Sequence, residues 1–196
     1  MAERTAWVAL LRGVNVGGNA RIRMADLCEI VASLGHGDVA TYIQSGNVVF
    51  TADAAGDAAS DDAASDEPAP DARLATGIHD ALIARLGLDV DVMVRSRDDL
   101  QRTVADVPFD VADPKRLIVA FLSRPPSPEA IRSLAAVEAG PEQFRVAGLV
   151  AYLDLPNGVG RSILAPLIER RLEVRATARN LRTVQTLLTM MGGSAG

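Results

Sequence analysis

The first half of the chain alternates short apolar runs with helical patterns. Two segments, 24–35 and 73–87, carry apolar residues at helical spacing and end in glycine, which predicts two helices. Apolar, β-branched or strictly alternating runs predict four strands, at 5–13, 38–44, 47–52 and 89–96. Residues 45–47 have the composition of the turn between the middle two strands. The resulting order, β-α-β-β-α-β, is the ferredoxin-like arrangement.

The second half repeats this order after a connecting helix over 96–108, where Ser96 and Asp99 have the spacing of a capping box. Strand patterns follow at 116–123, 143–155 and 174–180, and the second of these should fold as a hairpin turning at Ala147-Gly148. Helical patterns predict three further helices, at 127–140, 161–173 and 181–192.

Local signals sharpen the predicted ends of these helices. Ser127 should cap the helix over 127–140, with Pro128 at its first position and Gly140 at its end. Pro166 lies inside the helix expected over 161–173, where a proline is unfavourable. We therefore expect an α+β fold with two ferredoxin-like subdomains in tandem, an N-terminal one over 1–95 and a C-terminal one over 116–196 that adds a terminal helix. Residues 96–115 would form the connecting helix and linker.

Residues 51–71 hold seven acidic residues and no basic one, and almost all the rest are Ala, Ser, Gly or Pro. Such a segment buries too little apolar surface to offset its ordering entropy, so we expect a disordered acidic insertion. The net charge of −5 depends on this segment, because the rest of the chain has 20 basic and 18 acidic residues. Arginines gather at both ends of the chain, which favours an anionic partner, although they can also lie on solvated helix faces.

The composition indicates a cell compartment and limits the kinds of site that the chain can form. The N-terminus does not have the pattern of a signal peptide, and no apolar run approaches the length of a membrane span. A lone cysteine, Cys28, excludes an internal disulfide, so we expect a cytoplasmic protein without a membrane partner. With two histidines and one cysteine the chain has little from which to build a metal site, and we expect no metal and no cofactor.

The segment GVNVGGNAR, residues 13–21, lies between a predicted strand and a helix, where phosphate-binding loops occur. Asn15 occupies the place of a glycine in the dinucleotide-binding pattern. Asn19 and Ala20 replace the Lys and Ser/Thr of a P-loop, which contact the phosphates and Mg²⁺, so ATP hydrolysis is not expected. The Gly17-Gly18 backbone N–H groups can still bind an anion beside nearby arginines. The alternative is that the glycines only supply positive φ for a tight connection.

Three further loops concentrate polar residues. The loop 155–164 has a turn signature followed by Gly160-Arg161-Ser162, where a helix start capped by Ser162 could bind an anion or need no ligand. In the loop 176–184, Asn180 has the position of an N-cap, and Arg179 could bind an anion or pair with a carboxylate. The loop 42–47 is explained by a hairpin turn alone.

The sequence offers weak signals for catalysis and for RNA binding. Ser45 or Ser162 as a nucleophile would need a base that the sequence does not identify. Cys28 falls on an apolar helix face and is typical of an inert core thiol. Trp7, Tyr42 and Phe50 do not form the aromatic-rich pattern with which ferredoxin-like sheets stack RNA bases.

Several segments together resemble domain-of-unknown-function family 1697: VALLRGVNVGG, the Met-Ala-Asp-Leu helix start, VATYIQSGNVVF, and AYLDLPNGVGRSILAPLIERRLEVRATARNLRTV. The resemblance spans 6–190 apart from the acidic insertion. It implies a bacterial-type cytosolic protein with duplicated ferredoxin-like subdomains, and it implies no established activity. Two features depart from the family pattern: Leu181 stands where the family carries Trp, and the acidic insertion is longer than expected.

The leading functional hypothesis is a binding protein for a phosphate-bearing ligand, a nucleotide or a nucleic-acid segment. The alternatives are a structural or interaction module without a ligand, and an enzyme acting on a small anionic substrate with Ser45, Asn47 or Ser162 near the reacting atom. Whether the chain is an enzyme stays open. The motif positions supply the candidate ligand-binding residues: Arg12, Gly13, Asn15, Gly17, Gly18, Ser45, Asn47, Asn157, Gly158, Gly160, Arg161, Ser162, Arg179 and Asn180.

Overall fold

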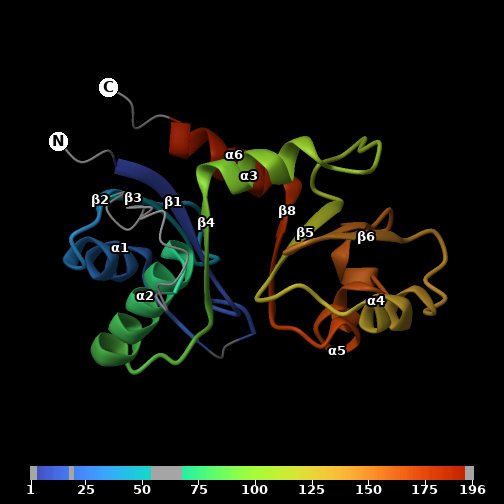
Figure 1. The fold of residues 1–196 in the computed structure, drawn as a ribbon, viewed down its shortest axis with the longest axis horizontal. Coiled ribbons are helices and arrows are strands. Elements are labelled where there is room, and N and C mark those ends of the chain that lie inside the picture. The colour runs from blue at the N-terminus through green and yellow to red at the C-terminus, as the bar shows by residue number, and fades with distance from the viewer. Residues whose placement is uncertain (1–3, 18–19, 54–67, 193–196) are drawn as a thin grey trace, which may run out of the picture. The chain divides into compact units, whose positions relative to one another are not determined.

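The computed structural model of the chain describes residues 4–17, 20–53 and 68–192 (Figure 1). It divides into two compact units, one comprising Met1–Leu100 with Leu187–Gly196 and one comprising Gln101–Thr186. The division falls inside helix α3 (Arg97–Ala105) and inside helix α6 (Leu181–Gly192), so each of these helices contributes residues to both units. Each unit contains one four-stranded sheet.

The first unit follows the order β1 (Arg4–Leu11), α1 (Met24–Ser33), β2 (Gly37–Thr41), β3 (Asn47–Asp53), α2 (Pro70–Leu86), β4 (Val92–Ser96). Its antiparallel sheet has the strand order β2-β3-β1-β4. Helices α1 and α2 lie side by side against one face (Figure 1). Alternate residues of β1 and β3, among them Trp7, Leu11 and Phe50, meet apolar residues of both helices there and form the core.

The second unit repeats this plan with β5 (Leu117–Leu122), α4 (Pro128–Ala135), β6 (Gln143–Ala147), β7 (Val150–Asp154), α5 (Ile168–Leu172) and β8 (Ala176–Asn180). Its sheet order, β6-β7-β5-β8, corresponds strand for strand to that of the first unit. Two 3₁₀ helices, η2 (Val159–Arg161) and η3 (Ala165–Leu167), precede α5. Both units therefore have the ferredoxin-like topology, and the predicted fold class is confirmed.

Most predicted elements lie where the sequence placed them, and the local caps are confirmed. Ser96 accepts a hydrogen bond from Asp99 N at 3.1 Å, and the Asp99 carboxylate accepts from Ser96 N at 3.1 Å, which completes the capping box at α3. Ser127 accepts from Ala130 N at the start of α4, with Pro128 in the first turn. Asn180 accepts from Thr183 N at 2.8 Å and caps α6.

Two predicted helices in the second half are wrong in extent. The helix over 127–140 ends at Ala135, where Ala136 N turns back to Arg132 O, so Gly140 is not its end. The continuous helix over 161–173 is replaced by two 3₁₀ helices and the short α5. Pro166 has no N–H group to donate within a helix and disfavours helical geometry at the residue before it, so the regular helix forms only after the proline.

The predicted disordered insertion over 51–71 is too wide at both ends. Thr51 to Asp53 pair with β1 as the end of β3, and the side chains of Thr51 and Ala52 are buried. At the other end, Pro70 opens α2 three residues earlier than predicted, because a proline fits the first helical turn. Residues 54–67, the centre of the predicted insertion, lie outside the described residues.

Within the described ranges, the structure contains no helix with both the length and the apolar character needed to cross a membrane.

Candidate anion-binding loops

The first candidate loop, residues 12–17, follows β1 and has a repeating backbone conformation. The φ angle is +67° at Gly13, +56° at Asn15 and +64° at Gly17, so every second residue is left-handed. Turns of this kind can aim successive N–H groups toward one point and form a concave anion site. Nothing lies within 4 Å of the Cβ position at Gly13 or Gly17, so their conformation rather than packing calls for glycine. The candidate Gly18 lies outside the described residues.

The backbone N–H groups of this loop differ in whether they donate to another part of the chain. Asn15 N donates to Ala20 O at 2.7 Å, which closes the loop. By contrast, the N–H groups of Gly13, Val16 and Gly17 donate no hydrogen bond to any residue that the structure describes. The loop therefore keeps several donors that an anion could accept from.

The Asn15 side chain holds the loop together. Its amide nitrogen donates to Ile22 O at 2.9 Å and to Gln44 O at 2.8 Å, and its oxygen accepts from Ile22 N at 3.1 Å. These bonds join the loop 12–17 to the start of α1 and to the loop 42–47. The structure therefore places Asn15 as a support of the loop, because each of these bonds ends on the protein's own backbone.

The loops 12–17 and 42–47 pack directly against each other. Leu11 N donates to Gly46 O at 2.8 Å, and Gly46 has a φ of +69°. A Cβ at Gly46 would stand 2.4 Å from a Val14 methyl group and 2.8 Å from the Leu11 Cβ, so only glycine allows this approach. Two of the predicted candidate segments thus come together in the first unit.

Ser45 and Asn47 form hydrogen bonds inside the loop 42–47. Asn47 is fully buried, and its amide donates to Tyr42 O at 3.1 Å and to Ser45 Oγ at 2.8 Å. The amide is thereby engaged in shaping the hairpin turn. The neighbouring Ile43 has a φ of +49° although its side chain is β-branched, and it is 51% exposed. Such strain persists only where surrounding contacts impose it, and it is common at functional sites.

The charge on this end of the first unit comes from arginines with different partners. Arg12 lies 3.5 Å from the Asp91 carboxylate, and both groups are partly exposed. Arg23 forms a close two-point pair with Asp26, whose carboxylate has a pKa lowered by that pair. Arg21 is exposed and makes no hydrogen bond or ion pair with the described residues. Arg12 lies in the loop itself and Arg21 follows it closely in the chain, so both can add positive charge beside the loop.

The second candidate loop, residues 155–164, already holds a carboxylate of the protein itself. Glu142 Oε2 accepts from Ser162 Oγ at 2.9 Å and from Leu164 N at 2.9 Å, and Glu142 Oε1 accepts from Ile163 N at 3.0 Å. Ser162 Oγ also accepts from Ala165 N, as the predicted cap should. The donors that the sequence suggested for an external anion are thus occupied by Glu142.

This pair does not resemble a nucleophile and its base. Burial raises the pKa of Glu142, but hydrogen bonds from Leu164, Ile163 and Ser162 more than reverse that effect, so the pKa lies below its usual value. A carboxylate held in this way is a weak base. The arrangement therefore supports a bracing role for Ser162 rather than a reactive one.

The remaining candidate residues of the second loop are either exposed or shape its backbone turn. Gly158 has a φ of +78°, and Gly158 N donates to Leu155 O at 2.8 Å in the turn. Asn157, Gly160 and Arg161 are exposed, and the Arg161 side chain has no hydrogen bond or ion pair with any residue that the structure describes. Arg161 is therefore the group of this loop best able to meet an anion.

The third candidate segment lies on β8, whose existence the sequence indicated. Arg179 donates to Thr177 Oγ1 and to Ala178 O, both at 2.8 Å and both neutral acceptors. Burial lowers the pKa of Arg179 to about 10, so the guanidinium still carries its charge at neutral pH. Asn180, by contrast, is used as the cap of α6.

Glu142 is the residue that sequence reasoning missed. It lies 20 residues before Ser162 in the chain, and no local spacing links the two. In the described part of the chain, no group of three or more His, Cys, Asp or Glu side chains is arranged so that it could hold a metal ion.

The fold and these loops define a class of protein: an α+β chain with two ferredoxin-like units and glycine-rich, arginine-flanked loops. A family model described as "Protein of unknown function (DUF1697)" matches residues 4–152. The chain therefore belongs to this family, as the sequence motifs indicated. The match includes the loops 12–17 and 42–47, whereas the motif residues from Asn157 onward lie beyond it.

A solved structure supports the fold. The conserved bacterial protein SP0830 from Streptococcus pneumoniae is similar with a TM-score of 0.67 and 21% sequence identity, over 96% of this chain and 99% of that one. At this identity the likeness shows the shared fold alone. No curated protein matches the chain.

Proposed function

We propose that the protein binds a phosphate-bearing ligand, a nucleotide or a nucleic-acid segment, at the loop 12–17 of its first unit. The observation that carries this proposal is the left-handed conformation at every second residue of the loop, together with three N–H groups that donate to no described residue. Arg12 and Arg21 would supply charge beside these donors. The loop 42–47, joined to it through Asn15, would hold it in shape before the ligand arrives.

The proposal is for binding, not for hydrolysis. Asn19 and Ala20 stand where a P-loop has the residues that contact the transferred phosphate and Mg²⁺. In the second unit, taken by itself, Arg161 and Arg179 are the candidates for binding an anion, because Glu142 already occupies the donors at Ile163 and Leu164. We place this activity in the cytoplasm, as the single cysteine suggests.

The test is the melting temperature in the presence of inorganic phosphates, nucleotides and short oligonucleotides. A ligand at 100 times its dissociation constant that binds only the folded state adds about 2.7 kcal/mol to the free energy of unfolding. We expect a ligand-dependent rise in wild type that Arg12→Ala abolishes and that Arg132→Ala, at an exposed arginine on α4 of the second unit, retains. Arg161→Ala reports separately on the second unit. A rise that is equal in wild type and Arg12→Ala would contradict the proposal.

A second candidate function, a structural module without a ligand, is favoured by a specific set of bonds. Asn15, Asn47 and Ser162 all direct their side chains to groups of the protein itself. Under this alternative, no ligand in the panel raises the melting temperature, and substitutions in the loops lower stability alone.

A further inference from the structure

The second unit contains a cavity of about 540 Å³, a volume within the range of small-molecule sites. Strands β5, β7 and β8 form its floor, on the face of the sheet that also packs against α4 and α5. The chain from Val159 to Glu169, which comprises η2, η3 and the start of α5, forms its wall. Every described residue that lines the cavity belongs to the second unit, so that unit forms the cavity by itself.

The short helix before β8 explains why this part of the sheet is open. In the first unit, α2 has 17 residues and packs on β4, where Val94 is 1% exposed. In the second unit, α5 has only five residues, because Pro166 delays the regular helix. Ala178 has the same place in its sheet as Val94, since they pair with the central alanines Ala120 and Ala9. Ala178 is nevertheless exposed, so α5 leaves uncovered what α2 covers in the first unit.

The side chains that a ligand would meet in this cavity are apolar. Val159 is 58% exposed, and Pro166 and Ala178 are exposed as well. The small side chains of Ala120 and Ala176 leave room above the sheet. A ligand that covers these groups removes apolar surface from water, and this removal favours binding.

The polar side chains of the lining are engaged by the protein itself. Glu169 Oε1 accepts from Ala176 N at 2.8 Å. Ser162 Oγ donates to Glu142 Oε2 at 2.9 Å and accepts from Ala165 N at 2.9 Å. The described lining residues include no arginine or lysine that would attract an anion, and Glu169 is the one ionisable group among them. A charged molecule would lose its hydration here for few polar contacts, so the cavity favours an uncharged one.

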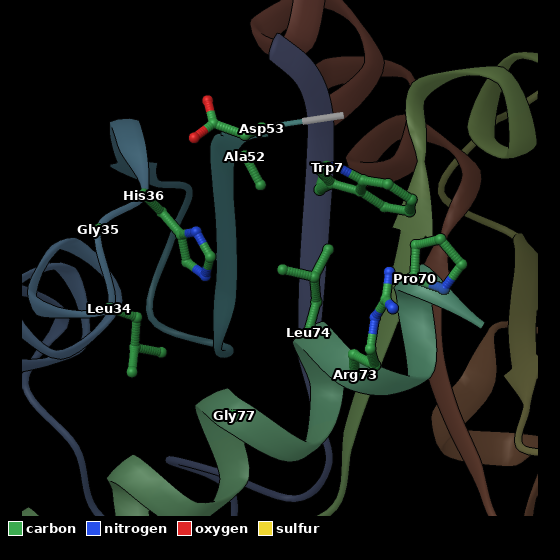
Figure 2. A pocket seen from close by; sticks show the side chains of 10 residues that line it. All are labelled: Trp7, Leu34, Gly35, His36, Ala52, Asp53, Pro70, Arg73, Leu74 and Gly77. Atoms are coloured by element: carbon green, nitrogen blue, oxygen red, sulfur yellow. The ribbon is translucent and has the colours of Figure 1, made fainter. Parts of the chain in front are cut away.

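The first unit also contains a cavity, of about 510 Å³, but its lining has a different chemistry. Figure 2 shows three ionisable residues in its walls, His36, Asp53 and Arg73. Trp7 borders the same cavity but is only 8% exposed, so it offers little surface to a ligand. An uncharged apolar molecule should therefore prefer the cavity of the second unit.

We propose that the cavity between the sheet of the second unit and residues 159–169 is a binding site for a small, uncharged, apolar molecule. The molecule would lie on the alanines of β5 and β8 and against Val159 and Pro166. This site is separate from the loop 12–17 and does not depend on the function proposed for that loop.

A neutral fluorescent probe tests the site on the full chain. N-Phenyl-1-naphthylamine becomes brighter in apolar surroundings, and 8-anilinonaphthalene-1-sulfonate has the same ring system with an added negative charge. We expect a saturable rise in emission with the neutral probe, and an affinity roughly tenfold or more above that of the sulfonate, because the charge must be desolvated. The absence of a saturable rise with the neutral probe, or equal or tighter binding of the sulfonate, would overturn the proposal.

Variants then locate the bound probe. Ala178→Phe should fill the cavity and weaken the neutral probe at least tenfold, whereas Ala147→Phe, at an exposed position of β6 outside the cavity, should bind it as wild type does. Wild-type affinity in Ala178→Phe would place the probe elsewhere and overturn the proposal. Melting temperatures show whether each variant folds.

A second pair of variants decides the matter should Ala178→Phe fail to fold. Val159→Ser should weaken the neutral probe about three- to tenfold, because apolar contact surface is lost. Ile163→Ser, at another exposed apolar residue that does not line the cavity, should leave the affinity unchanged. Equal affinities in these two variants would contradict the proposal. Arg12→Ala should bind the probe normally, so failure of the loop site and failure of this cavity are told apart.

Discussion

At the scale of single residues, the asparagines of the motif loops act mainly through the backbone they hold. Asn47 is fully buried and donates to Tyr42 O and Ser45 Oγ. We expect Asn47→Ala to lower the free energy of unfolding by about 1–3 kcal/mol, because buried acceptors lose their donor. Urea denaturation measures the loss. Asn157→Ala, at an exposed position, is the control and should stay within about 0.5 kcal/mol of wild type.

Tyr152 links stability to alkaline pH. Its hydroxyl donates to Thr103 O at 3.0 Å, and burial, aided by the charge of Asp106, raises the pKa of Tyr152 to about 12 from an ordinary value of 10.0. The folded state therefore favours the protonated tyrosine. Its contribution is complete below pH 10 and is lost as the pH rises toward 12.

We expect Tyr152→Phe to be less stable than wild type by about 1 kcal/mol at neutral pH, through the lost hydrogen bond. That difference should narrow between pH 10 and pH 12, as wild type loses the tyrosine contribution. Urea midpoints of both proteins across this range measure it, with Tyr42→Phe as the control. A difference that stays constant with pH would show that Tyr152 does not titrate in the way described.

At the scale of elements, a feature could be predicted from the sequence when the residues that form it lie close together in the chain. The capping box of Ser96 and Asp99 and the Asn180 cap lie within three residues of their partners, so the sequence alone indicated them. The Glu142 carboxylate reaches Leu164 across 22 residues, and only the folded hairpin brings the two together. For the same reason, the occupied donors at the second loop could not be foreseen from its glycines.

The contact between loops gives a paired test at this scale. Gly46 and Gly13 both have positive φ, but a Cβ meets close neighbours only at Gly46. Gly13→Ala should cost about 1–2 kcal/mol from backbone strain, and Gly46→Ala should cost more, because Val14 and Leu11 must also shift. Denaturant midpoints of the two variants compare them. Equal losses would mean that the loops do not pack as described.

At the scale of the whole molecule, the fold contains two copies of one topology, but the two compact units are not simply the first and second halves of the sequence. The strand order of the two sheets was predictable from the repeat of elements, and the family match agrees with the motifs in residues 4–152. The place of α6 was not predictable, because nothing in its sequence tells that residues from Leu187 onward group with the first hundred residues. Helix periodicity identifies a buried face without identifying what buries it.

This grouping predicts an effect on a distant reporter. Leu187 is 1% exposed and belongs to the first unit, as Trp7 does. We expect Leu187→Ala to lower the denaturant midpoint of the Trp7 fluorescence change, with a loss of about 2–5 kcal/mol. Arg182→Ala, an exposed position on the same helix, should leave that midpoint nearly unchanged. An unaltered midpoint in Leu187→Ala would contradict the grouping.

The central claim is that backbone donors of the loop 12–17 bind a phosphate group, and amide chemical shifts test it most directly. Inorganic pyrophosphate, titrated into isotope-labelled wild type and Arg12→Ala, is the simplest probe. The account predicts saturable shifts of the Gly13, Val16 and Gly17 amides in wild type, weakened in Arg12→Ala. Shifts confined to other parts of the chain, or no saturable shift in these three amides, would contradict it and leave the loop as a support of the fold.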